Sequence, residues 1–186
     1  MRHNSERHRR RTVRLKGYDY SGPGAYFVPI CAWNRECIFG EIINGGMKLN
    51  EYGKVIHREW MHTGDIRSNV EPDEFIVMPN HFHGIITIKA GNIRRGMARH
   101  APTGREFAKP VANSLSTIIG AFKSAVTKSI NILRNTPGMP VWQRNYFEHV
   151  IRNEKELSRI REYIRLNPLQ WDIDIENPEN IKKDDK

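Results

Sequence analysis

Two histidines, His81 and His83, stand on either side of Phe82 within the run 75–89, which is rich in strand-forming residues. Residues two apart in a β-strand point to the same face of the sheet. If this run is a strand, the two imidazoles project side by side, and Phe82 turns to the opposite face. Neutral imidazoles are common metal ligands. The alternative is a pair of surface histidines on a half-buried strand, because a catalytic metal site usually has three protein ligands.

A second polar pair, Tyr163 and Asn167, lies in the last helix that the sequence predicts. Residues four apart share one face of a helix, so these two side chains stack. They flank the apolar stripe of the helix and can reach the sheet on which that stripe packs. Taken singly, the tyrosine is typical of an amphipathic core residue with a hydrated hydroxyl, and an asparagine before Pro168 is typical of a helix end.

The elements that must position these residues follow from hydrophobic periodicity, strand-forming residues and turn signals. In chain order the sequence predicts a strand at 26–33, a hairpin at 39–49, a helix from Asn50, strands at 74–78 and 81–89, a helix after Ser114, a strand at 141–151 and a helix after Asn153. Pro29 indicates an edge position or a bulge in the first strand. The order fits an α+β fold with a βαββαβ core: an antiparallel sheet with helices on one face, an extra hairpin and a final helix.

The length of 186 residues suits one well-cored domain. Composition divides the chain into a basic, flexible arm at 1–16, a single domain at 17–171 and an acidic tail at 172–186. Within the domain, residues 91–112 predict a long basic loop. The arm is able to lie along a phosphate backbone, or it is only a solubilising tail.

The charge balance indicates a polyanionic partner. Lys and Arg total 30 against 21 Asp and Glu, which gives a net charge of +9. A merely solvated basic surface is the alternative. No apolar run approaches the roughly 18 residues of a membrane span, and the basic N-terminal residues lack the apolar region of a secretory signal. Two cysteines, Cys31 and Cys37, then indicate reduced thiols in a cytoplasmic protein.

The combined pattern resembles a known family. The segments are VMPNHFH at 77–83, WQR at 142–144 and YIRLNP at 163–168. Together they resemble the HUH single-tyrosine transposases, and most of all the branch of REP-associated tyrosine transposases. The likeness covers roughly residues 14–170. It implies a ferredoxin-like domain whose C-terminal helix carries the tyrosine and which acts on single-stranded or hairpin DNA with Mg²⁺ or Mn²⁺.

The resemblance also implies a role for each residue of the two pairs. His81, His83 and Asn167 correspond to the metal ligands, and Tyr163 corresponds to the nucleophile that attacks the scissile phosphate. The products are a 5′-phosphotyrosine and a free 3′-hydroxyl, which can later attack that linkage and rejoin strands in DNA transposition or recombination. Many relatives carry Gln at the Asn167 position, whereas the REP-associated branch resembles this chain in using Asn.

Basic residues outside the two pairs are candidates for DNA contacts or for offsetting the charge of a phenolate. They are Arg94, Arg95, Lys123, Arg144 and Arg165. A phenol has a pKa near 10 and is a weak nucleophile without help. Tyr163 also lies near a helix C-terminus, where the helix dipole disfavours negative charge.

Two other functions remain compatible with the sequence. One is a catalytically inactive protein that binds hairpins in DNA or RNA, and the other is a metallohydrolase in which water is the nucleophile. The oligomeric state is likewise open between a monomer and a homodimer, since related transposases exchange tyrosine helices between subunits whereas the REP-associated branch is expected to act as a monomer.

Overall fold

A computed structural model describes residues 18–90 and 113–181 of the chain. The predicted basic arm, the predicted loop at 91–112 with Arg94 and Arg95, and the last five residues lie outside the described residues. No helix within the described ranges is long and apolar enough to cross a membrane.

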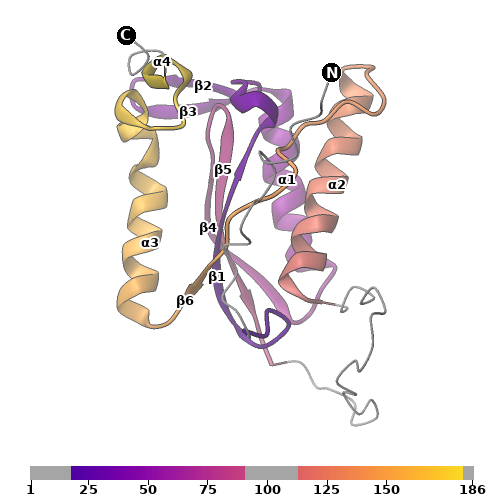
Figure 1. Ribbon diagram of the computed structural model, residues 1–186, viewed down its shortest axis with the longest axis vertical. Coiled ribbons are helices and arrows are strands. Elements are labelled where there is room, and N and C mark those ends of the chain that lie inside the picture. Colours follow the sequence, from indigo (N-terminus) through magenta and orange to yellow (C-terminus); the bar gives the residue numbers. More distant parts are fainter. Residues whose placement is uncertain (1–17, 91–112, 182–186) are drawn as a thin grey trace, which may run out of the picture.

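A four-stranded antiparallel sheet forms the centre of the fold (Figure 1). Its strands are β1 (Gly24–Cys31), β4 (Val70–Val77), β5 (His81–Ile88) and β6 (His149–Ile151). They lie in the order β4-β5-β1-β6. Helix α1 (Glu51–Asp65) connects β1 to the strands that follow, and α2 (Leu115–Leu133) connects β5 to β6. This is the βαββαβ, ferredoxin-like arrangement, so the predicted fold class is confirmed.

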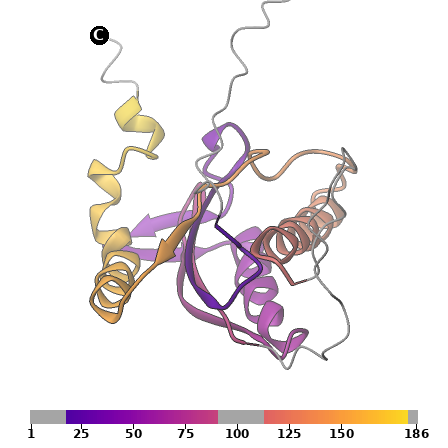
Figure 2. The same ribbon diagram turned by 60° about the horizontal axis from the view of Figure 1, so that its bottom comes forward.

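The helices form layers on both faces of the sheet (Figures 1 and 2). Helices α1 and α2 cover one face, where Trp60, Phe82 and Phe122 belong to the larger hydrophobic core. The centroids of the Trp60 and Phe82 rings lie 4.7 Å apart. Helix α3 (Glu154–Leu166) covers the opposite face. A smaller cluster holds it there, formed by Ile85, Ile151, Ile160 and Ile164.

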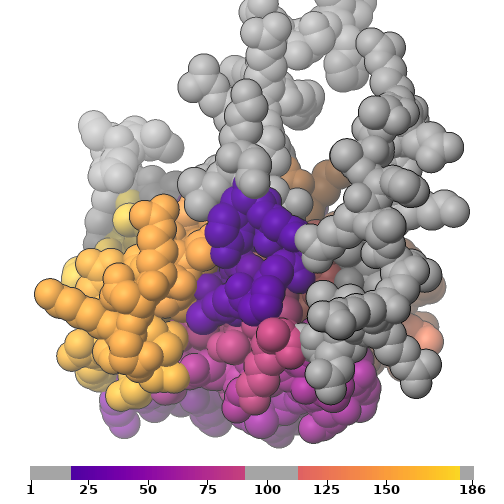
Figure 3. Space-filling model, turned by 90° about the horizontal axis from the view of Figure 1, so that it is seen from below, coloured from indigo at the N-terminus to yellow at the C-terminus, as the bar shows by residue number. Residues whose placement is uncertain are grey.

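Helix α3 is also distinct in a space-filling view from below, where its side chains lie on one side of the indigo residues that lead into β1 (Figure 3). Each of the three long helices begins directly after the residue at which the sequence predicts its start. Asn50, Ser114 and Asn153 accept hydrogen bonds from backbone N–H groups of the first helical turn. Local sequence therefore determines where these helices start.

Pro29 lies in a central strand, but at a position where that strand is paired on one side only. Its neighbour on β5 is His83. On the other side, β6 pairs only with the start of β1, from Ala25 to Phe27. Cys31 accepts a hydrogen bond on this side from the backbone of Gln143. Pro29 is two residues earlier and faces the same side, and it has no N–H to donate there.

The predicted strand at 141–151 is wrong over most of its length. Trp142 forms an isolated bridge to Ala32, and regular pairing resumes only at His149. Residues 143–148 leave the sheet opposite the part of β1 that contains Pro29. Loss of a backbone donor at that proline explains why the ladder is interrupted there.

The predicted hairpin is confirmed as β2 (Gly40–Ile43) and β3 (Gly46–Leu49). Asn44 and Gly45 form its turn with φ values of 52° and 73°. Two successive left-handed residues are the signature of a type I′ turn, which favours Asn-Gly. The hairpin lies across one end of the sheet, next to the 3₁₀ helix η3 (Asn167–Ile173) that follows α3 and close to the short helix α4 (Pro178–Ile181) (Figure 1).

Candidate functional site

Strand β5 places both histidines on the face that α3 covers. The His81 and His83 rings lie 4.6 Å apart between centroids, while Phe82 points into the core on the other face. His81 is 1% exposed and His83 is 5% exposed. They are therefore buried side by side and are not surface histidines.

Helix α3 brings Tyr163 to the same place. Its ring centroid lies 5.3 Å from that of His83 and 6.2 Å from that of Phe27 on β1. Ile160 and Ile164 on the same helix pack against the sheet and fix this position. The tyrosine itself remains 42% exposed. A phenol in this setting contacts His83 and is still open to a ligand from solvent.

Asn167 completes the group at the end of α3. It is the C-cap of the helix and is buried. Its Oδ1 atom lies 3.3 Å from Nε2 of His81, and its side chain is near enough to the Tyr163 hydroxyl to lower the pKa of that phenol. The structure thus brings together all four residues that the sequence singled out, from two segments that are 86 residues apart at His81 and Asn167.

Asn80 determines which nitrogen of His81 carries a proton. Its Nδ2 atom donates to the carbonyl oxygens of Arg35, at 3.0 Å, and Glu176, at 2.6 Å. The Oδ1 atom must therefore face Nδ1 of His81, at 2.9 Å, and accept its proton. In neutral His81 the lone pair then lies on Nε2, opposite the oxygen of Asn167. Two acceptors face each other there, an arrangement that a cation between them would stabilise.

The donor set fits a divalent metal ion. Nδ1 of His83 is buried and has no hydrogen-bond partner among the residues described. Within residues 18–90 and 113–181, no cluster of three or more His, Cys, Asp or Glu side chains is arranged to hold a metal. Asn167, whose Oδ1 faces His81, is consequently the best third donor among the described residues. Two imidazoles and an amide oxygen suit Mn²⁺ well and Mg²⁺ adequately.

Burial sets the protonation state of the site. It lowers the pKa of both His81 and His83 below the ordinary value, so both imidazoles are neutral at neutral pH. Burial also raises the pKa of Tyr163, and the charge of Asp174 adds to this effect, while the hydrogen bond from Asn167 opposes it. The site therefore holds two neutral potential ligands and a protonated phenol.

Residues after Asp172 contribute to the site although the sequence marks them only as an acidic tail. Glu176 forms an ion pair with Arg35 at 3.0 Å, and its backbone carbonyl holds Asn80. The ring of Trp171, which directly precedes this tail, lies 6.1 Å from that of His81. Asp174 and Asn177 are local signals of turns in this stretch, because their side chains accept hydrogen bonds from the backbones of Glu176 and Glu179. Nothing in residue spacing indicates where those turns pack.

The predicted basic residues do not gather around Tyr163. Arg165 forms an ion pair with Glu74 on β4 at 2.9 Å. Lys123 lies on α2, and its amine contacts the carbonyl oxygens of Gln143 and Arg144. Arg144 is exposed. Among the described residues, therefore, no direct contact is seen through which Lys123 or Arg165 could offset the charge of a Tyr163 phenolate.

The lowered pKa values of the two histidines predict a loss of stability in acid. An unfolded histidine has a pKa near 6.5 and takes up its proton before the buried one does as the pH falls. The free energy of unfolding of metal-free protein should therefore be highest above about pH 6.5 and decline below it. Urea unfolding between pH 7.5 and 5 measures this decline, and His83→Gln should make it shallower. An equally steep decline in His83→Gln would contradict the assignment.

Asn80→Ala should destabilise the protein and should allow His81 to populate both neutral tautomers. The variant leaves the carbonyl groups of Arg35 and Glu176 without a partner, which should cost about 2–4 kcal/mol in urea unfolding. The ¹⁵N chemical shifts of the His81 ring should change from a pure Nδ1–H pattern to a mixture. Asn145→Ala, at an exposed position, is the control. An unchanged His81 pattern in Asn80→Ala would rule out this role for Asn80.

Comparison with known proteins identifies a related sequence and a similar fold. No known family profile matches the sequence. An uncharacterized protein of Haemophilus influenzae is 39% identical over 176 residues, which span 93% of this chain and 96% of that protein.

Among solved structures, a REP-associated tyrosine transposase bound to a REP hairpin is similar with a TM-score of 0.57. The match covers 86% of this chain and 74% of that one, at 18% sequence identity. At this identity the likeness establishes a shared fold.

Proposed function

The chain belongs to the same protein family as the Haemophilus influenzae protein, and we propose that it is a DNA-processing enzyme of the HUH transposase type. It nicks single-stranded or hairpin DNA and rejoins strands through a covalent link to Tyr163. The observation that carries this proposal is the meeting of a half-exposed tyrosine with two buried, neutral histidines and a buried amide. The fold shared with a hairpin-bound transposase supports the choice of DNA as substrate.

His81, His83 and Asn167 would hold the metal ion. Bound there, a divalent cation supplies positive charge for a non-bridging phosphate oxygen and stabilises the charge that grows in the transition state. Asn80 keeps the lone pair of His81 aimed at Asn167. Neutral imidazoles are the state that metal ligands require, and burial maintains that state at neutral pH.

Tyr163 acts as the nucleophile. Its oxygen forms a bond to phosphorus as the phenolic proton leaves, and the bond from phosphorus to the 3′-oxygen breaks. The 3′-oxygen takes a proton and becomes a free hydroxyl, while the 5′-phosphate stays on the tyrosine. The reverse attack by a 3′-hydroxyl releases the tyrosine and joins strands. Because the pKa of Tyr163 is raised in the free protein, the nucleophile needs the cation and the hydrogen bond from Asn167.

One chain supplies every group that this chemistry needs. The tyrosine of α3 contacts His83 of its own chain, so we propose that the protein cuts as a monomer with its tyrosine in cis.

A covalent-trapping assay tests the proposal. The full chain is incubated with Mn²⁺ and a labelled single-stranded oligonucleotide that contains a hairpin, and the products are separated on a denaturing gel. A labelled band at the mass of protein plus DNA fragment, absent when EDTA is present, is the expected result. Bound but uncut DNA at every metal concentration would favour an inactive binding protein instead.

A further inference from the structure

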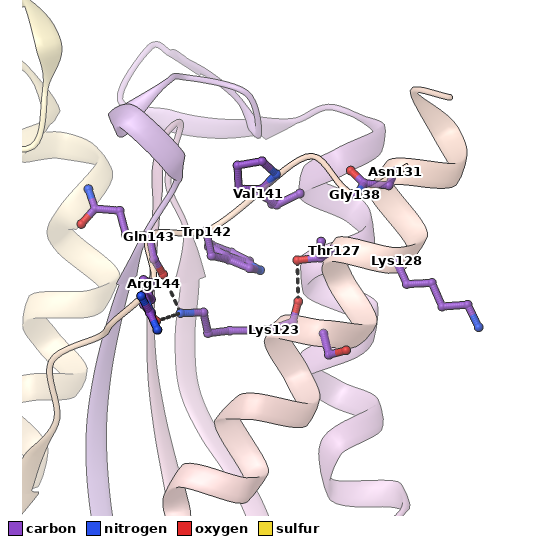
Figure 4. Close-up of a pocket in the computed structure, with 11 residues that line it drawn as sticks. Lys123, Thr127, Lys128, Asn131, Gly138, Val141, Trp142, Gln143 and Arg144 are labelled. Carbon is purple, nitrogen blue, oxygen red and sulfur yellow. Dashed lines mark hydrogen bonds between the residues drawn. The ribbon is translucent and has the colours of Figure 1, made fainter. Parts of the chain in front are cut away.

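A second concave region lies on the other side of β1 from the histidines, between α2 and the segment 138–144 (Figure 4). This pocket has a volume of about 440 Å³. Its lining includes three basic side chains, Lys123, Lys128 and Arg144, and no carboxylate. Such a lining favours an anionic ligand.

Lys123 is a partly buried cation that lacks an anionic partner. Its amine lies 2.7 Å from the carbonyl oxygen of Gln143 and 3.3 Å from that of Arg144. It also lies 5.7 Å from the centroid of the Tyr146 ring, so its contacts are with neutral groups. Among the residues described it forms no ion pair. Burial lowers its pKa to about 8. A bound anion would offset this cost.

Trp142 supplies an independent sign of a missing ligand. The residue is 5% exposed, and its indole Nε1 is buried without a hydrogen-bond partner among the described residues. Figure 4 shows the indole lying between its own segment and α2, with its nitrogen end toward the helix and above Lys123. An unpaired buried N–H is costly, and an acceptor that enters the pocket would remove the cost.

Strand β1 lies between the pocket segment and the histidine strand β5. Gln143 donates its backbone N–H to the carbonyl of Cys31 at 3.0 Å, and Cys31 pairs with His81 on its other side. The backbones of Gln143 and His81 are thus separated by two strand spacings, or about 10 Å.

We propose that this pocket is a phosphate subsite for single-stranded DNA, in which Lys123, Arg144 and the indole N–H of Trp142 contact one backbone phosphate. The proposal rests on the proposed function in taking DNA as the ligand, but it does not depend on cleavage. The ligand chemistry is a phosphate diester, which distinguishes the subsite from one for free inorganic phosphate.

Indole N–H resonances of the full-length, metal-free protein test this directly. Addition of a 12-residue oligothymidylate should shift the Trp142 signal, which is identified by its absence in Trp142→Phe. Trp60 is an internal control, because its Nε1 is also buried and unpartnered but the residue does not line the pocket. A Trp142 signal that stays unmoved at saturating DNA, or one that responds to inorganic phosphate and not to DNA, would overturn the subsite.

A charge variant provides the second measurement. Arg144→Gln should weaken binding of the oligothymidylate about fivefold or more at low salt and reduce the slope of log K against log salt by about 0.7. Arg152→Gln removes the same charge from an exposed residue outside the pocket and should leave the affinity within twofold. Equal losses in both variants would overturn the subsite.

The two proposals fail separately in these experiments. A Trp142 response without any covalent adduct leaves the subsite standing and overturns cleavage by Tyr163. An adduct in the trapping assay without a Trp142 response supports cleavage by Tyr163 and overturns the subsite.

Discussion

Tyr163→Phe is expected to abolish the covalent protein–DNA adduct and to lower DNA cleavage by at least about a thousandfold. The substitution removes one oxygen and keeps the ring that contacts His83 and Phe27. Metal binding and folding should therefore persist, and the loss should be confined to the chemical step. Quantitative gel analysis of adduct formed per unit time, with Mn²⁺ and labelled hairpin DNA, measures it.

A matched control and a clear alternative accompany this variant. Tyr52→Phe removes a hydroxyl from α1, on the opposite face of the sheet, and should cleave as wild type does. Cleavage that continues in Tyr163→Phe without an adduct would show that water is the nucleophile. The protein would then be a metallohydrolase, and the role proposed for Tyr163 would be wrong.

His83→Ala is expected to have the second largest effect, because it removes the imidazole that touches both His81 and Tyr163. Affinity for Mn²⁺ should fall by about a hundredfold or more, and adduct formation should fall with it. Calorimetric titration with Mn²⁺ measures the affinity without any DNA, so the metal site is tested apart from the reaction.

The controls for His83→Ala address folding and position. His57→Ala removes an exposed imidazole from α1 and should bind Mn²⁺ as wild type does. Urea unfolding of His83→Ala shows whether the cavity left by the ring has disrupted the domain. A folded His83→Ala protein that binds Mn²⁺ with unchanged affinity would contradict the proposed ligand set.

Two carboxylates near the site, those of Asp174 and Glu176, bear on why a cation would be needed there. Asp174 raises the pKa of both His81 and Tyr163, and Glu176 is held beside them by Arg35. Negative charge at this position disfavours both a phenolate and an incoming phosphate in the absence of metal. The proposed tyrosine attack is therefore expected to require a bound divalent ion.

Much of the candidate site can be predicted from the regular repeat of strands and helices. A period of two places His81 and His83 on one face of β5 and Phe82 on the other, as found. Helical spacing places Tyr163 and Asn167 on one face of α3, as found. Capping residues and the Asn-Gly turn likewise mark where α1, α2, α3 and the hairpin begin. These features depend on residues a few positions apart, where backbone geometry is nearly invariant.

Other features depend on long-range packing, and no local pattern encodes them. The sequence predicts a strand over 141–151, but the strand beside residues 143–148 offers a proline in place of a donor. Asn80 acquires its role only because the carbonyls of Arg35 and Glu176 converge on its amide. The side chains of Lys123 and Arg165 are engaged elsewhere, which the charge pattern alone does not reveal.

The two pairs of polar residues illustrate the division most clearly. Sequence alone establishes that each pair shares a face of its own element, because the repeat of a strand or helix is set by the backbone. Only the tertiary structure decides that the two faces meet, with 3.3 Å between His81 and Asn167. The physical reason is that α3 can bury its isoleucines against Ile85 and Ile151 only on the face that α1 and α2 leave open.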